Sequence, residues 1–311
     1  MAEIEFIITF LNGEKSKAAE VVSYEWSRDT RAACDGLRLV FLSESEPVEA
    51  VALEAYADGK CVFRGYADCQ SFSDGRAFIY ARSSACLLVD NEAPQLTYNA
   101  PCVNTLFLVN AEDFGFKNGL KNYWVRADYP IGRGTSCYGA INSFVRAFCK
   151  NNIAVSPDGV LYVPDGKKSY TVDKNAVLGL KKIIKRGEAV SRIDCKTDGE
   201  YNRHLKSTLL DKNGIRRSRK LSLSAVPEWQ RSTLLSSVIE DSAREYYSAE
   251  LTVSGVVTAE LCSPVIYDGL EGYRISSLVT LGNKNGVKTV IGLSKELELG
   301  EVEYVAEQKN E

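Results

Sequence analysis

Residues 51–63, VALEAYADGKCVF, hold the pattern that decides the fold. Val51, Leu53 and Ala55 alternate with small or charged residues, which is the two-residue period of a strand with one buried face. Asp58-Gly59 favours a two-residue hairpin turn, and the apolar run Cys61-Val62-Phe63 follows it. The stretch therefore predicts an antiparallel β-hairpin.

Similar strands surround this hairpin in the first part of the chain. Residues 37–41 (LRLVF) alternate in the same way, and Asp74-Gly75 offers a second hairpin turn before residues 77–80 (AFIY). Short strands at regular spacing, joined by turns with glycine, are typical of antiparallel barrels and sandwiches. We therefore expect residues 1–95 to form a β-barrel.

Helical patterns follow. Residues 136–148 begin at a Ser N-cap and carry an apolar stripe at helical spacing, and residues 153–163 predict a hairpin. Residues 174–185 predict a shorter helix capped by Asp173. A third helix is expected from near Ser232, running into a strand over 249–253.

The remaining segments predict strands and turns. These are strands at 190–195, 273–281 and 289–293, a hairpin turn at Asp211–Gly214 whose tip carries the basic run Arg216–Lys220, a turn at Asn285-Gly286, and a frayed acidic end from Glu296. On the third helix, Glu240 and Arg244 are spaced to form an i,i+4 ion pair.

These elements predict an α+β protein, mostly antiparallel β, in which two β-barrels flank an α/β insert domain. The two helix–strand units, near 136–163 and 232–254, are expected to pack as one layer. The predicted domains are 1–95 for the first barrel, 96–188 plus about 230–255 for the α/β middle domain, and 189–229 plus 256–311 for the second barrel.

Composition excludes several classes of protein. The 311 residues are 45% hydrophobic and 25% charged, as in ordinary globular chains, and no apolar run approaches the ~18–20 residues of a membrane span. MAEIEFIITF lacks the basic leader of a secretory signal. The nine cysteines are scattered without a CxxC, and His204 is the only histidine, so we expect free thiols and no metal site.

Charge is unevenly distributed along the chain. Residues 1–100 hold 9 basic and 16 acidic residues, residues 101–220 hold 22 and 11, and residues 221–311 hold 7 and 14. Such an acidic–basic–acidic layout suits either a nucleic-acid face or complementary contacts between subunits. We favour assembly, because aromatic residues do not interleave with the basic ones as stacking platforms would. Direct nucleic-acid binding by Arg216–Lys220 is the weaker interpretation.

Candidate catalytic groups are few. His204 lies on an expected strand without a nucleophile motif beside it, so a structural histidine is favoured. Glu240 and Asp241 are adjacent on a helix and point about 100° apart. Asp90 and Glu92 are spaced to lie on one side of an extended segment, but turn or surface roles are favoured.

Nucleotide-binding loops are missing from the sequence. Neither the P-loop pattern nor the dinucleotide-binding glycine motif occurs. Gly132-Arg133-Gly134 precedes a helix and would allow anion binding, although a helix-cap role is favoured. The sequence thus predicts no catalytic, cofactor-binding or metal-ligating residue.

Seven short stretches carry a resemblance to a known family. They are VSYEWSRD (22–29), ACDGL (33–37), FRGYAD (63–68), ARSSACLLVDNEA (81–93), DGVL (158–161), LEGYRI (270–275) and residues 287–293. In these stretches the chain resembles the baseplate hub family of contractile-tailed phages and phage-tail-like bacteriocins, most closely the short hub proteins of Gram-positive prophages.

This resemblance implies a non-enzymatic structural protein without cofactors. It implies a homotrimer whose subunits each carry two tube-like barrels, so that six similar domains face a hexameric tail tube above while a spike attaches below. The tape-measure protein and inner baseplate components would be neighbours, and assembly would take place in the bacterial cytoplasm before incorporation into a virion or tail-like particle. A basic middle segment would then face an acidic flank of the next subunit, and charge reversal at Arg216, Arg217 and Arg219 would weaken assembly.

Two other classes of function remain open. One is a tail-associated hydrolase of cell wall or carbohydrate that uses a carboxylate pair such as Asp90 and Glu92. The other is a solitary β-rich carbohydrate-binding module, for which exposed tryptophans would be expected. Trp26, Trp124 and Trp229 are far apart in sequence and are more typical of core or interface positions.

Overall fold

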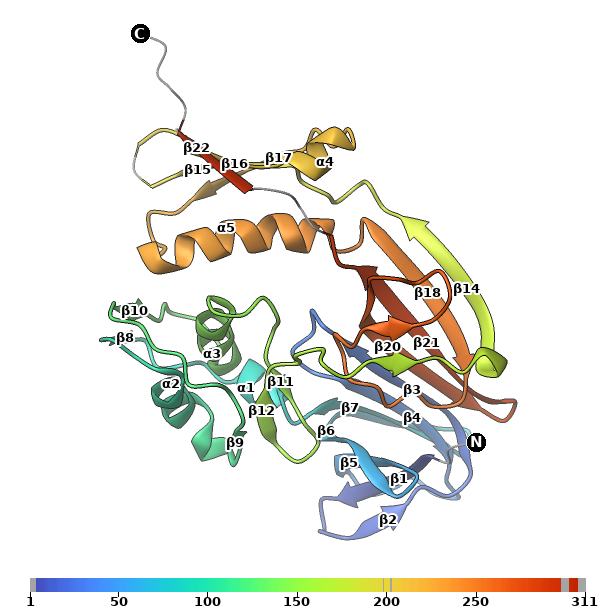
Figure 1. The fold of residues 1–311 in the computed structure, drawn as a ribbon. Helices are drawn as coiled ribbons and strands as arrows, with labels where there is room; N and C mark the ends of the chain where they lie inside the picture. The colour runs from blue at the N-terminus through green and yellow to red at the C-terminus, as the bar shows by residue number, and fades with distance from the viewer. Residues whose placement is uncertain (1–3, 198, 202, 298–301, 307–311) are drawn as a thin grey trace.

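Eleven antiparallel strands form one continuous sheet that dominates the fold (Figure 1). The computed structural model describes residues 4–197, 199–201, 203–297 and 302–306. The strand order is β14-β18-β21-β20-β3-β4-β7-β6-β5-β1-β2. The bounds are β1 (Ile4–Phe10), β2 (Lys15–Lys17), β3 (Val21–Asp29), β4 (Gly36–Leu42), β5 (Ala50–Ala57), β6 (Lys60–Ser73), β7 (Arg76–Ser83), β14 (Val177–Ile184), β18 (Tyr247–Ser254), β20 (Tyr273–Asn283) and β21 (Gly286–Lys295).

The predicted hairpins are present in this sheet. Strands β5 and β6 pair across Asp58-Gly59, both of which have the positive φ angles of a tight primed turn. Asp74-Gly75 turns β6 into β7 in the same way. The last hairpin, β20–β21, turns at Lys284-Asn285, one residue earlier than expected.

The sheet is made of two halves joined by one pair of strands. Strand β3 pairs with β20 from Ser23↔Asn283 to Asp29↔Ser277, although these residues are more than 240 positions apart. This pairing gives one open sheet that ends at β14 and β2, and not the two closed barrels that were expected. The α+β class with mostly antiparallel strands is confirmed.

Both halves have the same internal order. Strands β3, β4, β6 and β7 pair in the order β3-β4-β7-β6, and β14, β18, β20 and β21 pair in the order β14-β18-β21-β20. In each half the last two strands form a hairpin with a two-residue turn, and the first strand has a bulge, at Val21/Ser23 and at Val177/Gly179. The chain therefore contains a structural repeat that its sequence does not display.

Each half buries its own apolar face. The core of the first half includes Phe6, Trp26, Leu39 and Ile79, and that of the second half includes Leu251, Leu278 and Ile291. Short parallel strands β13 (Tyr170–Thr171) and β19 (Val265–Ile266) pair beside the second half. Because inward and outward side chains alternate, the opposite face of the sheet is left more polar.

The segment after β7 forms a helical unit with its own core. It contains α1 (Cys86–Asp90), α2 (Val103–Asn110), a 3₁₀ turn (Glu112–Phe114), α3 (Cys137–Arg146) and the short strands β8 (Thr97–Tyr98), β9 (Lys117–Asn118), β10 (Tyr129–Pro130), β11 (Ala154–Val155) and β12 (Val160–Tyr162). Ser136 caps α3 as expected, and β11–β12 is the predicted hairpin. Leu106, Ile141 and Phe144 are fully buried between α2 and α3.

A fourth unit is a four-stranded sheet covered by a long helix. Its order is β17-β15-β16-β22, with bounds β15 (Arg192–Lys196), β16 (Arg203–Ser207), β17 (Ser218–Ser222) and β22 (Val302–Ala306). Helix α5 (Glu228–Ala243) packs against it through Leu235 and Ile239. In Figure 1 this helix lies between the small sheet and α3.

Four local predictions were wrong. The predicted helix 174–185 is a 3₁₀ turn (Lys174–Ala176) followed by strand β14, because Val177, Ile183 and Ile184 are β-branched and pair with β18. The predicted turn at Asp211–Gly214 belongs to helix α4 (Thr208–Lys212) and the loop after it, and β17 then pairs with β15 in parallel.

The other two concern the last part of the chain. Strand β18 joins the large sheet and forms no layer with β12, and Val302–Ala306 is a strand where fraying was expected. The rest of the segment from 298 onward lies outside the described residues. The division into domains stays a prediction. Strands β14 and β18, which it assigns to the α/β middle domain, pair in the large sheet.

Gly282 should be required at the β3–β20 junction. A Cβ at this position would lie 2.1 Å from the ring of buried Tyr24, so Gly282→Ala should lower the free energy of unfolding by about 1–3 kcal/mol. Gly179→Ala in β14, where nothing lies within 4 Å of an added Cβ, is the matched control and should be neutral. Chemical unfolding of both variants measures this, and equal stabilities would contradict the packing described.

Candidate functional site

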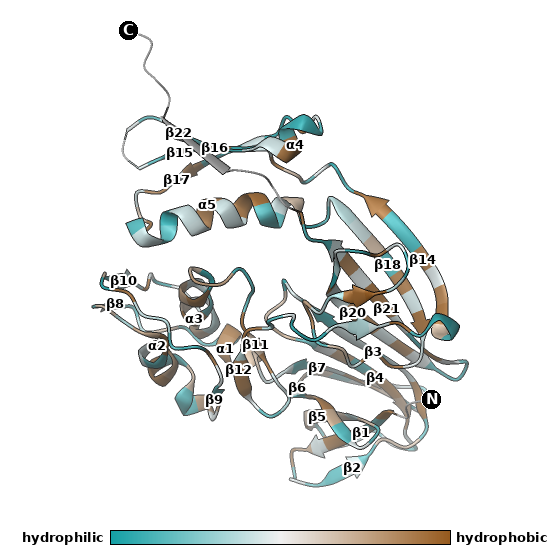
Figure 2. Cartoon of the chain, in the orientation of Figure 1, coloured by the Kyte–Doolittle hydropathy of each residue, from teal (hydrophilic) through white to brown (hydrophobic). Residues whose placement is uncertain are grey.

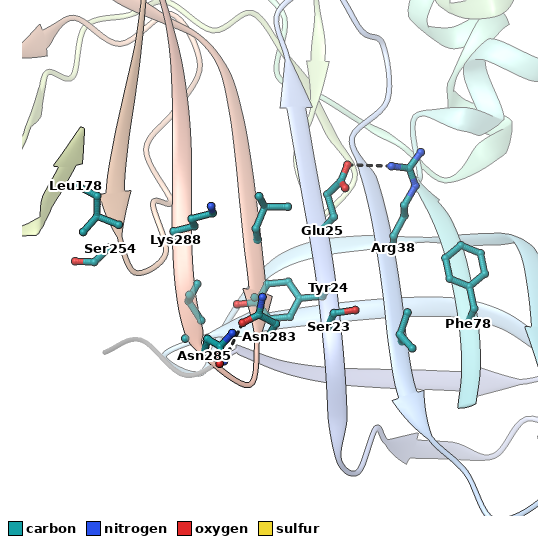
Figure 3. A pocket seen from close by; sticks show the side chains of 15 residues that line it. Ser23, Tyr24, Glu25, Arg38, Phe78, Leu178, Ser254, Asn283, Asn285 and Lys288 are labelled. Atoms are coloured by element: carbon teal, nitrogen blue, oxygen red, sulfur yellow. Dashed lines mark hydrogen bonds and ion pairs between the residues drawn. The ribbon is translucent and has the colours of Figure 1, made fainter. Parts of the chain in front are cut away.

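A groove of about 760 Å³ crosses the junction between the two halves of the sheet (Figure 3). It lies on the more polar face, near the β20–β21 turn. Its lining comes from seven strands and the turn: Ser23, Tyr24, Glu25, Arg38, Val40, Phe78, Leu178, Ser254, Leu281, Gly282, Asn283, Asn285, Gly286, Val287 and Lys288.

The chemistry of the groove suits contact more than catalysis. Arg38 Nη1 lies 3.0 Å from Glu25 Oε1, so the carboxylate of Glu25 already has a cationic partner within the groove. Burial raises the pKa of Tyr24 to about 12, which keeps its hydroxyl protonated at neutral pH. The groove therefore offers hydroxyl, amide and apolar groups together with the cations Arg38 and Lys288, and its carboxylate, Glu25, is held in an ion pair.

Asp90 and Glu92 lie in different surroundings. Arg82 holds Asp90 with two hydrogen bonds, Nη2–Oδ2 at 2.7 Å and Nη1–Oδ1 at 3.0 Å, and also contacts Asp68. The hydrogen bonds from Arg82 lower the pKa of Asp90, whereas a general acid needs a raised pKa. Glu92 is exposed and forms a backbone bridge with Ser136.

Glu240 and Asp241 serve to attach α5 to the helical unit. Glu240 binds Lys150 at 2.6 Å, and Asp241 binds Arg146 at 2.9 Å. Arg244 pairs with Asp241 at i,i+3, and not with Glu240 as expected. Each carboxylate thus has a cationic partner close by, which suits a structural role.

His204 lies on strand β16, opposite Asp194 of β15 and Val305 of β22. Its Nδ1 is buried without a hydrogen-bond partner among the described atoms. A catalytic histidine needs an orienting partner and a nucleophile within hydrogen-bond reach. The placement therefore agrees with the structural role that the sequence favoured.

The basic run lies on a sheet edge and not at a hairpin tip. Arg216 pairs with Asp211, and Arg217 Nη1 donates to the carbonyl of Arg186 at 2.6 Å. Arg219 and Lys220 lie on edge strand β17, where both are exposed. Charges on an edge strand block unwanted strand pairing, which was the alternative interpretation of this run.

The tryptophans are in three different environments. Trp26 is buried under the guanidinium of Arg28. Trp229 packs edge-on against Phe144 and thereby joins α5 to α3. Trp124 alone of the three is exposed, at 56%, with Arg126 over its ring, so they do not form one carbohydrate-binding surface.

The glycine turn and the cysteines carry no further site. Gly134 has a positive φ angle and leads into the Ser136 cap of α3, which is the helix-cap role. All nine cysteines are free thiols. Across the described ranges, no three His, Cys, Asp or Glu side chains are grouped to hold a metal ion, and no helix has the length and hydropathy to cross a bilayer.

Sequence analysis missed a partly enclosed cavity of about 80 Å³ at the junction of three units, where charged side chains lie among apolar ones. Arg28 of β3 and Asp35, from the loop before β4, line it together with Tyr162 of β12 and Arg244 after α5. Arg28 Nη2 donates to the Val257 carbonyl at 3.1 Å, while its Nε is buried without a partner among the described atoms. This volume has room for two or three water molecules.

Asp35 should make stability depend on pH. Burial raises its pKa to about 6, against the opposing effect of Arg28, whereas an unfolded chain has about 3.9. The folded state is therefore favoured by protonation, and stability should fall as pH rises from about 4 through 6. Asp35→Asn should remove this fall and stabilise the protein at pH 8 by roughly 1–3 kcal/mol.

Unfolding midpoints at pH 4, 6 and 8 measure the effect. Glu44→Gln, at an exposed loop position, is the control and should follow the wild type. An Asp35→Asn variant that is no more stable than wild type at pH 8 would contradict the assignment.

Among known proteins, this chain finds matches only in solved structures. No family model matches the sequence, and no curated protein matches it. Among solved structures, the chain is similar to the 43 kDa tail protein of prophage MuSo2 from Shewanella oneidensis, with a TM-score of 0.75 and 15% identity over 94% of this chain and 98% of that one.

Two further structures extend this likeness. A tail protein from Neisseria meningitidis has a TM-score of 0.71 and 17% identity over 95% of this chain and 96% of that one. A component of the type VI secretion system from E. coli, itself described as similar to the bacteriophage T4 tail proteins gp27 and gp5, has a TM-score of 0.57 and 10% identity over 91% and 76%. The chain thus has the fold of prophage tail proteins along nearly its whole length.

Proposed function

We propose that this chain is a structural hub protein of a contractile-tail baseplate. In this proposal three copies form a ring that adapts a hexameric tail tube to a trimeric spike. The observation that carries it is the internal repeat: two halves with the same strand order are joined side by side at β3–β20. Three such chains would present six similar units around one axis, which is the symmetry match that a hexameric tube requires.

The comparisons support a place in a tail. The most similar structures reported above are tail proteins matched from end to end, and the secretion-system component is related in its description to two T4 tail proteins. We therefore propose the tail tube and the spike as direct partners, with the tape-measure protein and inner baseplate components as neighbours. The location would be a virion or tail-like particle, and the short Gram-positive prophage type remains part of the proposal.

The repeat also refines the proposed domains. Each tube-like domain would correspond to one half of the large sheet, with the helical unit inserted after β7 and the four-stranded unit inserted between β14 and β18. The first tube-like domain would then include β1 to β7. The second tube-like domain would then include β14 and β18, in place of β15–β17.

Enzymatic alternatives gain no support from the described side chains. Of the carboxylates considered for catalysis, Asp90 is bound by Arg82, Glu240 by Lys150, and Asp241 by Arg146 and Arg244. Glu92 is exposed and does not share the ion pair of Asp90. A zymogram on bacterial cell wall tests this directly. Clearing that is lost on Asp90→Asn would favour the hydrolase over the hub.

The solution mass should be that of a trimer. Light scattering coupled to size exclusion should give about three times 34.3 kDa, and the trimer should co-purify with tube and spike proteins. Failure to bind either protein would contradict the proposed function.

Charge reversal on β17 should weaken assembly if the basic segment faces an acidic flank of the next copy. Arg219→Glu is the cleanest change of the three considered, because Arg216 and Arg217 have partners within the chain. The midpoint of trimer dissociation should move to a several-fold higher protein concentration than in the wild type. Added salt should narrow this difference, because it screens both the attraction in the wild type and the repulsion in the variant. Lys60→Glu, at the exposed β5–β6 turn, is the control, and equal dissociation of both variants would contradict this contact.

A further inference from the structure

The cavity that holds Arg28 and Asp35 lies between the large sheet and the helical unit. One wall is residues 28–35, and the opposite wall is residues 151–157 with Tyr162 of the β11–β12 hairpin. Tyr138 Oη of α3 donates to the Ile153 carbonyl at 3.0 Å, so this hairpin is attached to the helical unit. In Figure 2 the hairpin lies between the helices and the strands of the large sheet.

Polar contacts across the cavity converge on Thr30. Asn152 Nδ2 donates to the Thr30 carbonyl at 2.8 Å, and Arg244 Nη1 donates to the Thr30 hydroxyl at 3.3 Å. The large sheet and the helical unit have separate apolar cores. Because water can replace hydrogen bonds of this kind at modest cost, the hairpin wall can move without disrupting either core.

Asp35 carries an unshared charge in this cavity. Its backbone is fixed to β7 by two hydrogen bonds, from Ser83 N to the Asp35 carbonyl at 2.9 Å and from Asp35 N to Ser83 Oγ at 3.0 Å. No described residue gives its carboxylate a hydrogen bond or an ion pair, and burial raises its pKa to about 6. Since the backbone is anchored to the sheet, an ionised Asp35 can gain water only if the opposite wall moves.

Arg28 compensates this charge only in part. Its Nη2 donates to the Val257 carbonyl at 3.1 Å, and its positive charge is shared with Glu260, whose pKa is also raised by burial. Nearby Arg244 is bound to Asp241 at 2.9 Å. The titratable and charged groups around Asp35 are Arg28, Asp29 and Cys34 on the sheet side, and Tyr162, Arg244, Glu260 and Cys262 on the other walls.

We infer that this cavity is a proton-operated latch between the large sheet and the helical unit. With Asp35 protonated, the β11–β12 hairpin is closed on the sheet through the Thr30 contacts. When Asp35 ionises, the hairpin wall moves away and water hydrates the carboxylate. Both units keep their own cores in the open form.

Linkage sets the direction and the size of the effect. A hydrated aspartate has a pKa of about 3.9, below the value of Asp35 in the closed cavity. The closed form therefore binds the proton more tightly and is favoured at low pH. Full hydration of Asp35 in the open form would shift the equilibrium towards opening by up to about a hundred-fold between pH 4 and pH 7.5.

Cys262 lines the cavity and should report the opening through its rate of alkylation. At pH 7.5, N-ethylmaleimide should label Cys262 several-fold more slowly in Asp35→Asn than in the wild type, because the amide keeps the latch closed. Exposed Cys69 is the internal standard and should react equally in both proteins. The charge of Asp35 alone would act in the opposite direction, since a nearby anion disfavours the thiolate.

Asp29→Asn is the matched control variant. Asp29 lines the same cavity, but Arg31 Nε lies 3.5 Å from its carboxylate. Its labelling at Cys262 should equal that of the wild type. Equal rates in the wild type and Asp35→Asn, or equal slowing in both variants, would overturn the latch.

Hydrogen exchange separates local opening from global unfolding. At pH 7.5 the amides of residues 151–157 should exchange several-fold faster in the wild type than in Asp35→Asn. This exchange should be insensitive to low concentrations of denaturant, because a local opening exposes little surface. A steep dependence on denaturant would mean that these amides exchange through global unfolding, and would overturn the latch.

Discussion

The pairing of β3 with β20 is the constraint on which the rest of the structure depends. Seven residue pairs, from Ser23↔Asn283 to Asp29↔Ser277, join the start of the chain to a segment near its end. Without them the two halves of the sheet would each have another open edge. Close packing of Tyr24 on Gly282 fixes the register there, since a shift by one residue would turn every side chain to the wrong face.

The other units are arranged around this junction. Arg31, just after β3, binds Glu245 at 2.5 Å, and Glu245 also binds Lys185 at the end of β14, so one carboxylate links both halves to α5. Asn152 of the helical unit donates to the Thr30 carbonyl at 2.8 Å in the same region. The inserted units are therefore fixed to the sheet by polar contacts near one end of the β3–β20 junction. The groove lies at the other end of this junction.

Local signals in the sequence were sufficient for the hairpins and caps, but not for pairing at a distance. Asp58-Gly59 and Ser136 act through their immediate neighbours, and both predictions were confirmed. Residues 174–185 were predicted as a helix because Lys181, Lys182 and Lys185 hide the apolar pattern of a strand. That strand is stabilised by β18, which lies more than sixty residues later in the sequence. The same limit applied to the candidate site. The ion pairs of Asp90 and Glu240 and the cavity of Arg28 and Asp35 depend on partners that only the fold brings together.

The central claim is that three copies form a ring to which each chain contributes two equivalent halves of its large sheet. Imaging the assembled protein by electron cryomicroscopy tests this claim most directly. We expect a ring with three-fold symmetry and six similar lobes, two from each copy. A ring with another number of copies, or a three-fold ring without six similar lobes, would contradict this claim.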